Sequence, residues 1–453
     1  MPVPSDSFPV SEHALPDHLA ALAIRPGDSA YDAVRHTYTR LGSPAAVLRV
    51  RDAEDIAAAL VHARDSHLPL TVRSGGHGIS GRSTNNGGLV IDLSRLASVT
   101  VLDADARLVR IEAGARWGDV AAALAPYGMA LSSGDTGDVG VGGLATAGGI
   151  GLMARAHGLT IDHMRAAELV LADGSAVRVD AQHDPDLFWA VRGAGANFGV
   201  ATAFEFEAAR VDGVCVDVSV FDAADTAGFL TRWGGWIERS PREVTSFLTL
   251  ATGPGGLPVA QVMTVYAGGD MDAARPALRP LGSIGAVLQN QLVATPYHRL
   301  LPAGHQPQYA QQPLTVSRSG LLHHIDDQVA HAIATVAPAA GIVQLRSVGG
   351  AVNDMPATAT AYAHRTQNFS LMAATVPALR GDLDQRWDGL TPHIDGLYLS
   401  FETRTGPRQL SDAFPQPVLG RLLTLKDRYD PDNVFTNNFA LRRPAGDGDV
   451  RKR

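Results

Sequence analysis

Three glycine-rich segments in the first half of the chain constrain its fold more than any other feature. They run over Arg73–Gly78, Gly140–Gly151 and Gly193–Gly199. Successive glycines let several backbone N–H groups point into one concavity, which can hold a pyrophosphate without a lysine. This suits a chain whose lysines are Lys426 and Lys452 alone. Each segment by itself could be a tight turn, but three in one half predict that backbone approaches a ligand closely.

The usual motifs of other enzyme classes are missing or out of context. Gly140–Ala145 satisfies the Rossmann pattern G-x-G-x-x-G/A, with Asp162 at a suitable distance for a ribose contact. It follows the polar loop Ser132–Asp138 instead of the first strand of a βαβ unit, so we reject that interpretation. No serine has the glycines of a nucleophile elbow, and no histidine or cysteine pattern predicts a metal site.

Length and charge limit the organisation and the partners. A chain of 453 residues predicts two or three domains, since a domain usually holds roughly 100 to 200 residues. The net charge of -8 gives no general attraction to nucleic acid or to anionic lipid. No run reaches the roughly 18 apolar residues of a membrane span, and no signal peptide is recognised, so we expect a cytoplasmic protein. Cys215 is the only cysteine, which excludes an intrachain disulfide.

The hydrophobic pattern changes near Val211. The first half alternates short β-runs with alanine-rich helical segments, and the second half has longer alternating strands that predict an antiparallel sheet. The expected helices are 52–66, 117–125, 187–192 and 418–428, and the expected strands are 70–73, 89–93, 108–112, 164–171, 177–180, 201–207, 259–266, 343–352, 369–376 and 397–401. The prediction is an α+β protein with domains at 1–208 and 209–411 and a C-terminal return over 412–453.

Four ordered motifs resemble one family, the berberine-bridge-enzyme-like oxidases, whose fold is that of vanillyl-alcohol oxidase. The run Val72–Gly78 through Gly87–Ser94 is similar to the family's FAD-attachment segment. The likeness continues through 142–162, 186–199 and 429–438, and Gly349–Ala351 with Ala361–Arg365 is similar to the bacterial members. The resemblance implies a two-part PCMH-type FAD-binding domain and a substrate domain whose antiparallel sheet is flanked by helices.

The resemblance also implies the cofactor and its ligands. His77 would be bonded to the flavin 8α-methyl group. Many relatives bond FAD a second time through a cysteine, but here Thr136 stands at that position, so a single bond is expected, as in the 6-hydroxy-D-nicotine oxidase branch. The implied FAD-binding residues are Arg73, Ser74, Gly75, Gly76, His77, Gly78, Thr136, Val139, Gly142, Gly143, Asn197, Gly199, Val200 and Asn437.

The implied reaction is removal of hydride from a small organic molecule, followed by reoxidation of the flavin by dioxygen. Val139 occupies the position that resembles the family's oxygen gate. Tyr398, Tyr362 and His364 are the expected base or orienting groups, and Arg404 or Arg365 is expected to lower a tyrosine pKa. Alternation in the predicted strand Leu397–Phe401 would turn Tyr398 and Ser400 toward the flavin.

The sequence does not determine the identity of the substrate. An alcohol, amine or ring carbon of a natural product or other small metabolite is the first expectation, and a carbohydrate is the second. A non-redox cyclase or binding protein that uses FAD structurally is the alternative from another class. The expected partners are the substrate and dioxygen, with no nucleic acid and no membrane, and the sequence does not determine an oligomeric state.

Overall fold

A small sheet with the strand order β1-β2-β4-β3 opens the fold of this computed structural model, which describes residues 15–302 and 314–442. The strands β2 (Ala46–Arg49), β4 (Leu89–Asp92) and β3 (Leu70–Arg73) are parallel, and β1 (Ala23–Ile24) is antiparallel to β2. Parallel strands need a crossover connection, and the helix α3 (Ala53–Asp65) lies between β2 and β3 in the chain.

The helix α3 shows how the sequence positions these elements. It begins at Asp52, whose side chain accepts a hydrogen bond from the Asp55 N–H at 2.9 Å and so satisfies one free donor of the first turn. Ile56, Ala59 and Leu60 follow at helical spacing and are buried in the core that the sheet shares. The expected helix over 52–66 is therefore confirmed.

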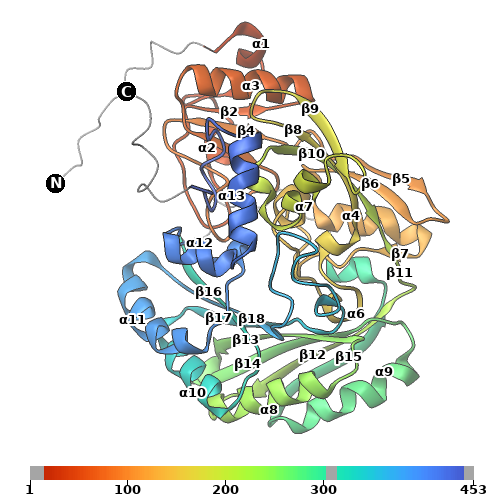
Figure 1. The fold of residues 1–453 in the computed structure, drawn as a ribbon. Coiled ribbons are helices and arrows are strands. Elements are labelled where there is room, and N and C mark those ends of the chain that lie inside the picture. Colours follow the sequence, from red (N-terminus) through yellow and green to blue (C-terminus); the bar gives the residue numbers. More distant parts are fainter. Residues whose placement is uncertain (1–14, 303–313, 443–453) are drawn as a thin grey trace.

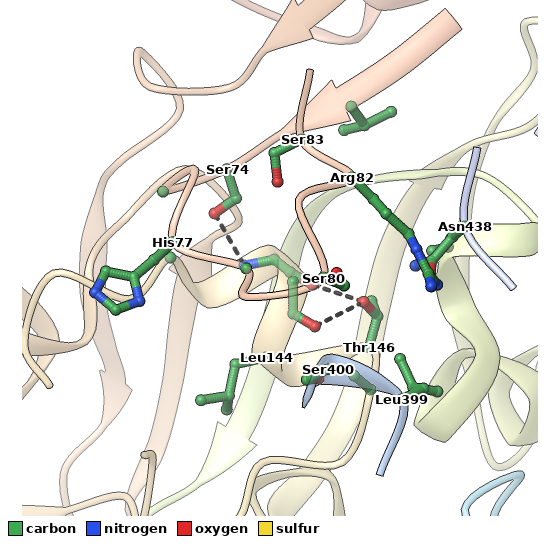
Figure 2. Close-up of a pocket in the computed structure, with 18 of the residues that line it drawn as sticks. Ser74, His77, Ser80, Arg82, Ser83, Leu144, Thr146, Leu399, Ser400 and Asn438 are labelled. Atoms are coloured by element: carbon green, nitrogen blue, oxygen red, sulfur yellow. Dashed lines mark hydrogen bonds between the residues drawn. The ribbon is translucent and has the colours of Figure 1, made fainter. Parts of the chain in front are cut away.

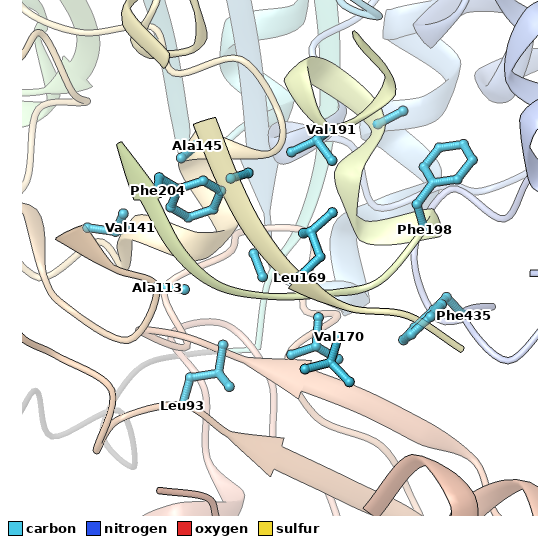
Figure 3. Close-up of a cluster of buried hydrophobic side chains, with 14 of the residues drawn as sticks. Leu93, Ala113, Val141, Ala145, Leu169, Val170, Val191, Phe198, Phe204 and Phe435 are labelled. Carbon is cyan, nitrogen blue, oxygen red and sulfur yellow. The ribbon is translucent and has the colours of Figure 1, made fainter. Parts of the chain in front are cut away.

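A second, antiparallel sheet completes the first part of the molecule. Its strands, in spatial order, are β5 (Val99–Asp103), β6 (Leu108–Glu112), β10 (Val200–Glu207), β8 (Met164–Val170) and β9 (Ala176–Asp180). Figure 3 shows Leu93, which follows β4, in one apolar cluster with Leu169 and Phe204 of this sheet. The helices α4 (Trp117–Leu124), α5 (Val141–Ala145) and α7 (Pro185–Ala194) contribute buried side chains to the same core.

The second part is built on a seven-stranded antiparallel sheet. In spatial order its strands are β15 (Val287–Thr295), β12 (Val214–Asp222), β14 (Pro258–Tyr266), β13 (Val244–Thr252), β17 (Ile342–Ser347), β18 (Phe369–Thr375) and β16 (Val316–Leu322). The helices α8 (Thr226–Arg239), α9 (Met271–Leu278), α10 (Asp327–Val336) and α11 (Arg380–Leu390) cover the face turned away from the first part (Figure 1). Side chains of the other face, such as Phe247 and Leu321, pack with Ile150 and Ile161 of the first part.

The C-terminal segment returns to the first part, where α13 (Val418–Tyr429) lies beside α7 (Figure 1). Lys426 of α13 is buried and donates hydrogen bonds to the backbone carbonyl oxygens of Asn197 at 2.8 Å and of Phe435 at 3.0 Å. It also pairs with Asp430, one turn further along. The helix α12 (Pro407–Ala413) precedes this return. Among the described residues, no helix is both long enough and apolar enough to cross a membrane.

Two expected strands end early or do not form. The strand expected over 343–352 stops at Ser347, because Gly349 and Gly350 take φ values of +83° and +54°. The segment 397–401 is no strand; Leu399–Phe401 is a 3₁₀ turn.

The segment around this turn is hydrogen-bonded to the edge strand β16 along its length. Leu321 N–H donates to Gly396 O at 2.9 Å, and Thr403 N–H donates to Ser317 O at 3.3 Å. Between these bonds, Tyr398 N–H donates to the Ser319 hydroxyl at 3.1 Å and the Ser317 hydroxyl donates to Phe401 O at 2.7 Å. Phe401 N–H donates to Tyr398 O at 3.1 Å and closes the turn.

Candidate active site

A cavity of about 270 Å³ lies between the first part and the inner face of the seven-stranded sheet. Five stretches supply most of its wall: 70–83, 134–150, 193–201, 398–401 and 435–439, with Arg346 and Phe414. The three glycine-rich segments of the sequence therefore meet around one space, although they are far apart in the chain. Of the residues implied for the cofactor, Ser74, Gly75, Gly76, His77, Gly78, Val139, Gly142, Gly143, Asn197, Gly199 and Asn437 line it.

Two of these segments touch backbone to backbone. A Cβ added to Gly75 would lie 2.5 Å from Gly140 N, and one added to Gly140 would lie 2.1 Å from Gly75 N. Ser74 fixes the approach, because its hydroxyl donates to Ala113 O at 2.5 Å and accepts from Gly142 N–H at 3.3 Å (Figure 2). By contrast, a Cβ on Gly143 would meet no protein atom within 4 Å. The wall of the cavity is therefore bare backbone at Gly143.

His77 lies at one end of the cavity, and Arg82 and Asn438 lie at the other (Figure 2). The His77 ring stacks on Tyr38, with ring centroids 4.1 Å apart and planes inclined by 12°. Removal from water lowers the pKa of His77, although Asp135 and Asp138 oppose the shift. The imidazole is therefore neutral near pH 7 and keeps a nitrogen lone pair for bond formation.

Five of the implied or expected site residues do not line the cavity. The buried guanidinium of Arg73 pairs with Asp92 at 2.6 Å and so joins the neighbouring strands β3 and β4. Thr136 donates to Asp135 Oδ1 at 3.3 Å, and Val200 is paired with Val170 in the second sheet. These contacts support the loops that form the wall, and the direct contact with a cofactor that the motif implies stays a prediction.

Tyr362 and His364 are the other two residues outside the wall. His364 is buried, and its Nε2–H donates to Ala413 O at 3.1 Å. The edge of its ring contacts Tyr362, with centroids 5.6 Å apart. Burial raises the pKa of Tyr362 strongly. Tyr362 is in edge contact with Tyr398, with centroids 6.1 Å apart, and the role of Tyr362 and His364 as base or orienting groups stays a prediction.

Tyr398 is buried and lines the cavity. Its ring lies edge-on to Phe401 at a centroid distance of 5.0 Å, and its hydroxyl oxygen accepts the Gly149 N–H at 3.1 Å. Burial raises the pKa of Tyr398, and the Ser400 hydroxyl, the Gly149 amide and Arg346 offset this only in part. The phenol is therefore protonated near pH 7.

The two arginines expected to lower a tyrosine pKa each form an ion pair. Arg404 pairs with Glu402 at 3.0 Å, and Arg365 pairs with Asp162 at 2.8 Å. Arg365 also lies 5.3 Å from the centre of the Tyr362 ring and favours a lower pKa there, but burial outweighs this effect and the pKa of Tyr362 is raised. The cation that does act on Tyr398 is Arg346, which sequence reasoning missed.

Arg346, Asp135 and Arg82 are the charged residues of the wall that the sequence did not single out. Arg346 and Asp135 form an ion pair of 2.9 Å that joins β17 to the loop before α5. Arg82 stacks on Phe439 and donates to Asn438 Oδ1 at 2.9 Å, and burial lowers its pKa to about 10. One signal was present for Arg346, which is the only charged residue in the otherwise uncharged run Ile342–Val352.

Comparison with known proteins assigns the fold and the chemistry. Residues 44–180 match the family model described as FAD binding domain. A FAD-linked oxidoreductase of Metarhizium anisopliae, dpmaF, is 31% identical over 89% of this chain and 85% of its own length. The (R)-6-hydroxynicotine oxidase of Paenarthrobacter nicotinovorans is 28% identical, over 95% of this chain and 98% of its own.

Solved structures of relatives share the whole arrangement. A chitooligosaccharide oxidase aligns with a TM-score of 0.80 and 25% identity, covering 93% of this chain and 97% of its own. The resemblance seen in the motifs and the predicted fold class are both confirmed. The chain belongs to the berberine-bridge-enzyme-like family of FAD-linked oxidoreductases with the PCMH-type fold, and it is an FAD-dependent oxidase of small organic molecules.

Proposed function

We propose that the chain oxidises an alcohol, amine or ring carbon of a natural product or similar small metabolite. The carrying observation is the position of Tyr398, whose phenol lines the cavity and is held by the Gly149 N–H of the second glycine-rich segment. Leu144, Ile150 and Leu399 make the surrounding wall largely apolar, which favours a ligand with a hydrophobic body. The similarity to a nicotine oxidase supports this substrate class.

The cavity residues fit FAD. Gly143 leaves its part of the wall free of side chains, and the glycine-rich loops offer backbone N–H groups to a pyrophosphate. We propose a single covalent bond between His77 and the 8α-methyl group, supported by the neutral imidazole at one end of the cavity. Thr136 does not line the cavity and has no thiol for a second bond.

When bound, FAD accepts hydride from the substrate and passes the electrons to dioxygen. The protein side chains are proposed to hold the substrate, to exclude water from the cavity and to accept one proton from the substrate. Tyr398 is proposed to take the proton that leaves the substrate hydroxyl or amine, which requires its phenolate form. Val139, half-buried in the cavity wall, is proposed as the residue that leaves room for dioxygen.

A carbohydrate oxidase is the second candidate, because a solved chitooligosaccharide oxidase shares the fold over nearly the whole chain. The domain limits proposed from the sequence, 1–208, 209–411 and 412–453, stay as proposals. The seven-stranded sheet lies within the second range, and α13 lies within the third.

The decisive experiment mixes the purified enzyme anaerobically with alcohols, amines, phenolic metabolites and oligosaccharides. Loss of the oxidised flavin absorption identifies a substrate, and admission of oxygen should restore the absorption with release of hydrogen peroxide. Bleaching by the metabolites and not by the oligosaccharides is expected. Bleaching by oligosaccharides alone would select the second candidate, and bleaching without peroxide release would contradict an oxidase.

A further inference from the structure

Arg346 carries a buried hydrogen-bond donor that the described part of the protein leaves unused. Its side chain is 5% exposed, and Nη2 donates to Asp135 Oδ2 at 2.9 Å. Nη1 is buried and has no hydrogen-bond partner among residues 15–302 and 314–442. A buried guanidinium N–H without an acceptor is costly, so an unused donor in a cavity wall points to a ligand that supplies the acceptor.

The surroundings hold this donor rigidly. The guanidinium carbon lies 4.3 Å from the centre of the Phe401 ring and 5.4 Å from that of Phe247. Phe247 and Ser370 are the cross-strand neighbours of Arg346 in the sheet. The Ser370 hydroxyl is buried and also lacks a partner, so this row of the sheet does not satisfy Nη1.

The charge balance decides which acceptor is suitable. Burial alone would raise the pKa of Asp135, but the guanidinium of Arg346, the Thr136 hydroxyl and His77 together outweigh it and keep that pKa low. Asp135 is therefore ionised, and the pair with Arg346 has no net charge. An anionic ligand would gain little from the pair and would lose its hydration, whereas a neutral acceptor oxygen gains a donor at small desolvation cost.

We propose that Nη1 of Arg346 binds a neutral carbonyl, ether or hydroxyl oxygen of the substrate, with the apolar body of the molecule beside Phe401 and Tyr398. This rests on the proposed function, because it takes the cavity as the substrate site. It restricts the substrate to an apolar molecule with an uncharged acceptor oxygen, and it makes Arg346 a specificity-determining residue that acts together with Tyr398.

The test uses inert probes of equal shape and the holoenzyme. Acetophenone carries a carbonyl oxygen, and α-methylstyrene replaces that oxygen with a methylene group. Binding of each is followed by the change in the flavin absorption spectrum, without turnover. The wild type should bind acetophenone about 10-fold to 100-fold more tightly, the range expected for a hydrogen bond from a charged donor.

The double variant Arg346→Met/Asp135→Asn removes the donor without leaving a buried carboxylate alone, and its binding ratio should fall to about one. The control is Arg318→Met/Asp384→Asn, which removes an ion pair between β16 and α11 outside the cavity wall and should keep the wild-type ratio. An unchanged ratio in the first variant, or no preference in the wild type, overturns the proposal.

Benzoate is the third probe in the binding test, because it carries an anionic carboxylate on the same aromatic ring. Weaker binding of benzoate than of acetophenone is expected, and tighter binding overturns the preference for a neutral oxygen. The titrations need only flavin in the cavity. If the proposed function is wrong about which substrate bond is oxidised, these titrations give the same result. That error appears only in the anaerobic bleaching experiment.

Discussion

Few side chains are proposed to take part in the chemistry, and His77 has the most specific proposed role, a covalent bond to the flavin. A neutral ring held against Tyr38 at the end of the cavity is suited to a permanent bond with the flavin. We expect the wild-type protein to stay yellow after acid precipitation, because such a bond does not depend on the fold. His77→Ala should release its FAD into the supernatant. Release of all flavin from the wild type would contradict the covalent bond.

Tyr398 is expected to act as a base although burial raises its pKa, and this gives its role a pH signature. Only the phenolate can accept a proton, so the rate of flavin reduction should rise with pH across 7 to 9.5. Tyr398→Phe should lower that rate by about 100-fold to 10,000-fold and remove the slope, with FAD retained. Stopped-flow reduction at several pH values measures both effects.

Tyr297→Phe is the matched control for Tyr398→Phe. Tyr297 is equally buried but does not line the cavity, so its loss of a hydroxyl should leave the reductive rate unchanged. A rate within about threefold of wild type in Tyr398→Phe, far from the usual contribution of a general base, would remove the assigned role. A rate that does not change with pH would instead favour the protonated phenol as a hydrogen-bond donor.

Val139 should govern the second half of the reaction. A leucine there adds a methylene group to the cavity wall, so Val139→Leu should slow reoxidation of the reduced flavin by oxygen. The reductive half-reaction should stay close to wild type. Rapid mixing of reduced enzyme with oxygenated buffer gives the rate directly, and equal reoxidation rates in the two proteins would end the case for an oxygen gate.

At the scale of the element, α5 and the loop before it form part of the cavity wall, which is bare backbone at Gly143. Gly143→Ala adds a methyl group that meets no protein atom, so the fold should persist while FAD incorporation falls. Gly389→Ala in the helix α11 is the control, because its added methyl group also meets nothing and lies outside the cavity wall. The flavin-to-protein absorbance ratio measures incorporation, and equal ratios would show that FAD does not lie against Gly143.

Elements with strong local signals could be predicted from the sequence, and those set by distant contacts could not. The strands Leu70–Arg73 and Leu108–Glu112 form within their expected limits, and α3 follows its cap at Asp52. Leu397–Phe401 alternates like a strand, but the hydroxyls of Ser317 and Ser319 on β16 bind its backbone, and the segment closes into a turn. No local pattern contains those bonds.

The residues of the site also fall into those that the sequence could predict and those that it could not. The glycine-rich loops and His77 could be recognised because the motif is contiguous in the chain. Arg346 and Asp135 could not, since they are 211 residues apart and become a pair only when the seven-stranded sheet packs on the loop before α5. The sequence could therefore indicate the wall proposed to contact FAD, whereas the wall proposed to contact the substrate depends on how the two parts pack.

At the scale of the whole molecule, buried histidines couple folding to pH. Burial lowers the pKa of His364, so the folded protein keeps this ring neutral below pH 6.5 while the unfolded chain takes up a proton. Proton uptake then favours unfolding. The free energy of unfolding should fall as the pH is lowered from about 6.5, by at most about 1.4 kcal/mol per pH unit for one such histidine.

His364→Gln tests this coupling, because glutamine can still donate to the Ala413 carbonyl oxygen but does not titrate. Its free energy of unfolding should be less sensitive to pH between 5 and 6.5 than that of the wild type, as measured by urea titration at each pH. His331→Gln, at an exposed position on α10, is the control and should keep the wild-type slope. Parallel curves for wild type and His364→Gln would mean that the pH dependence arises elsewhere, for instance at His157 or His163, whose pKa values burial also lowers.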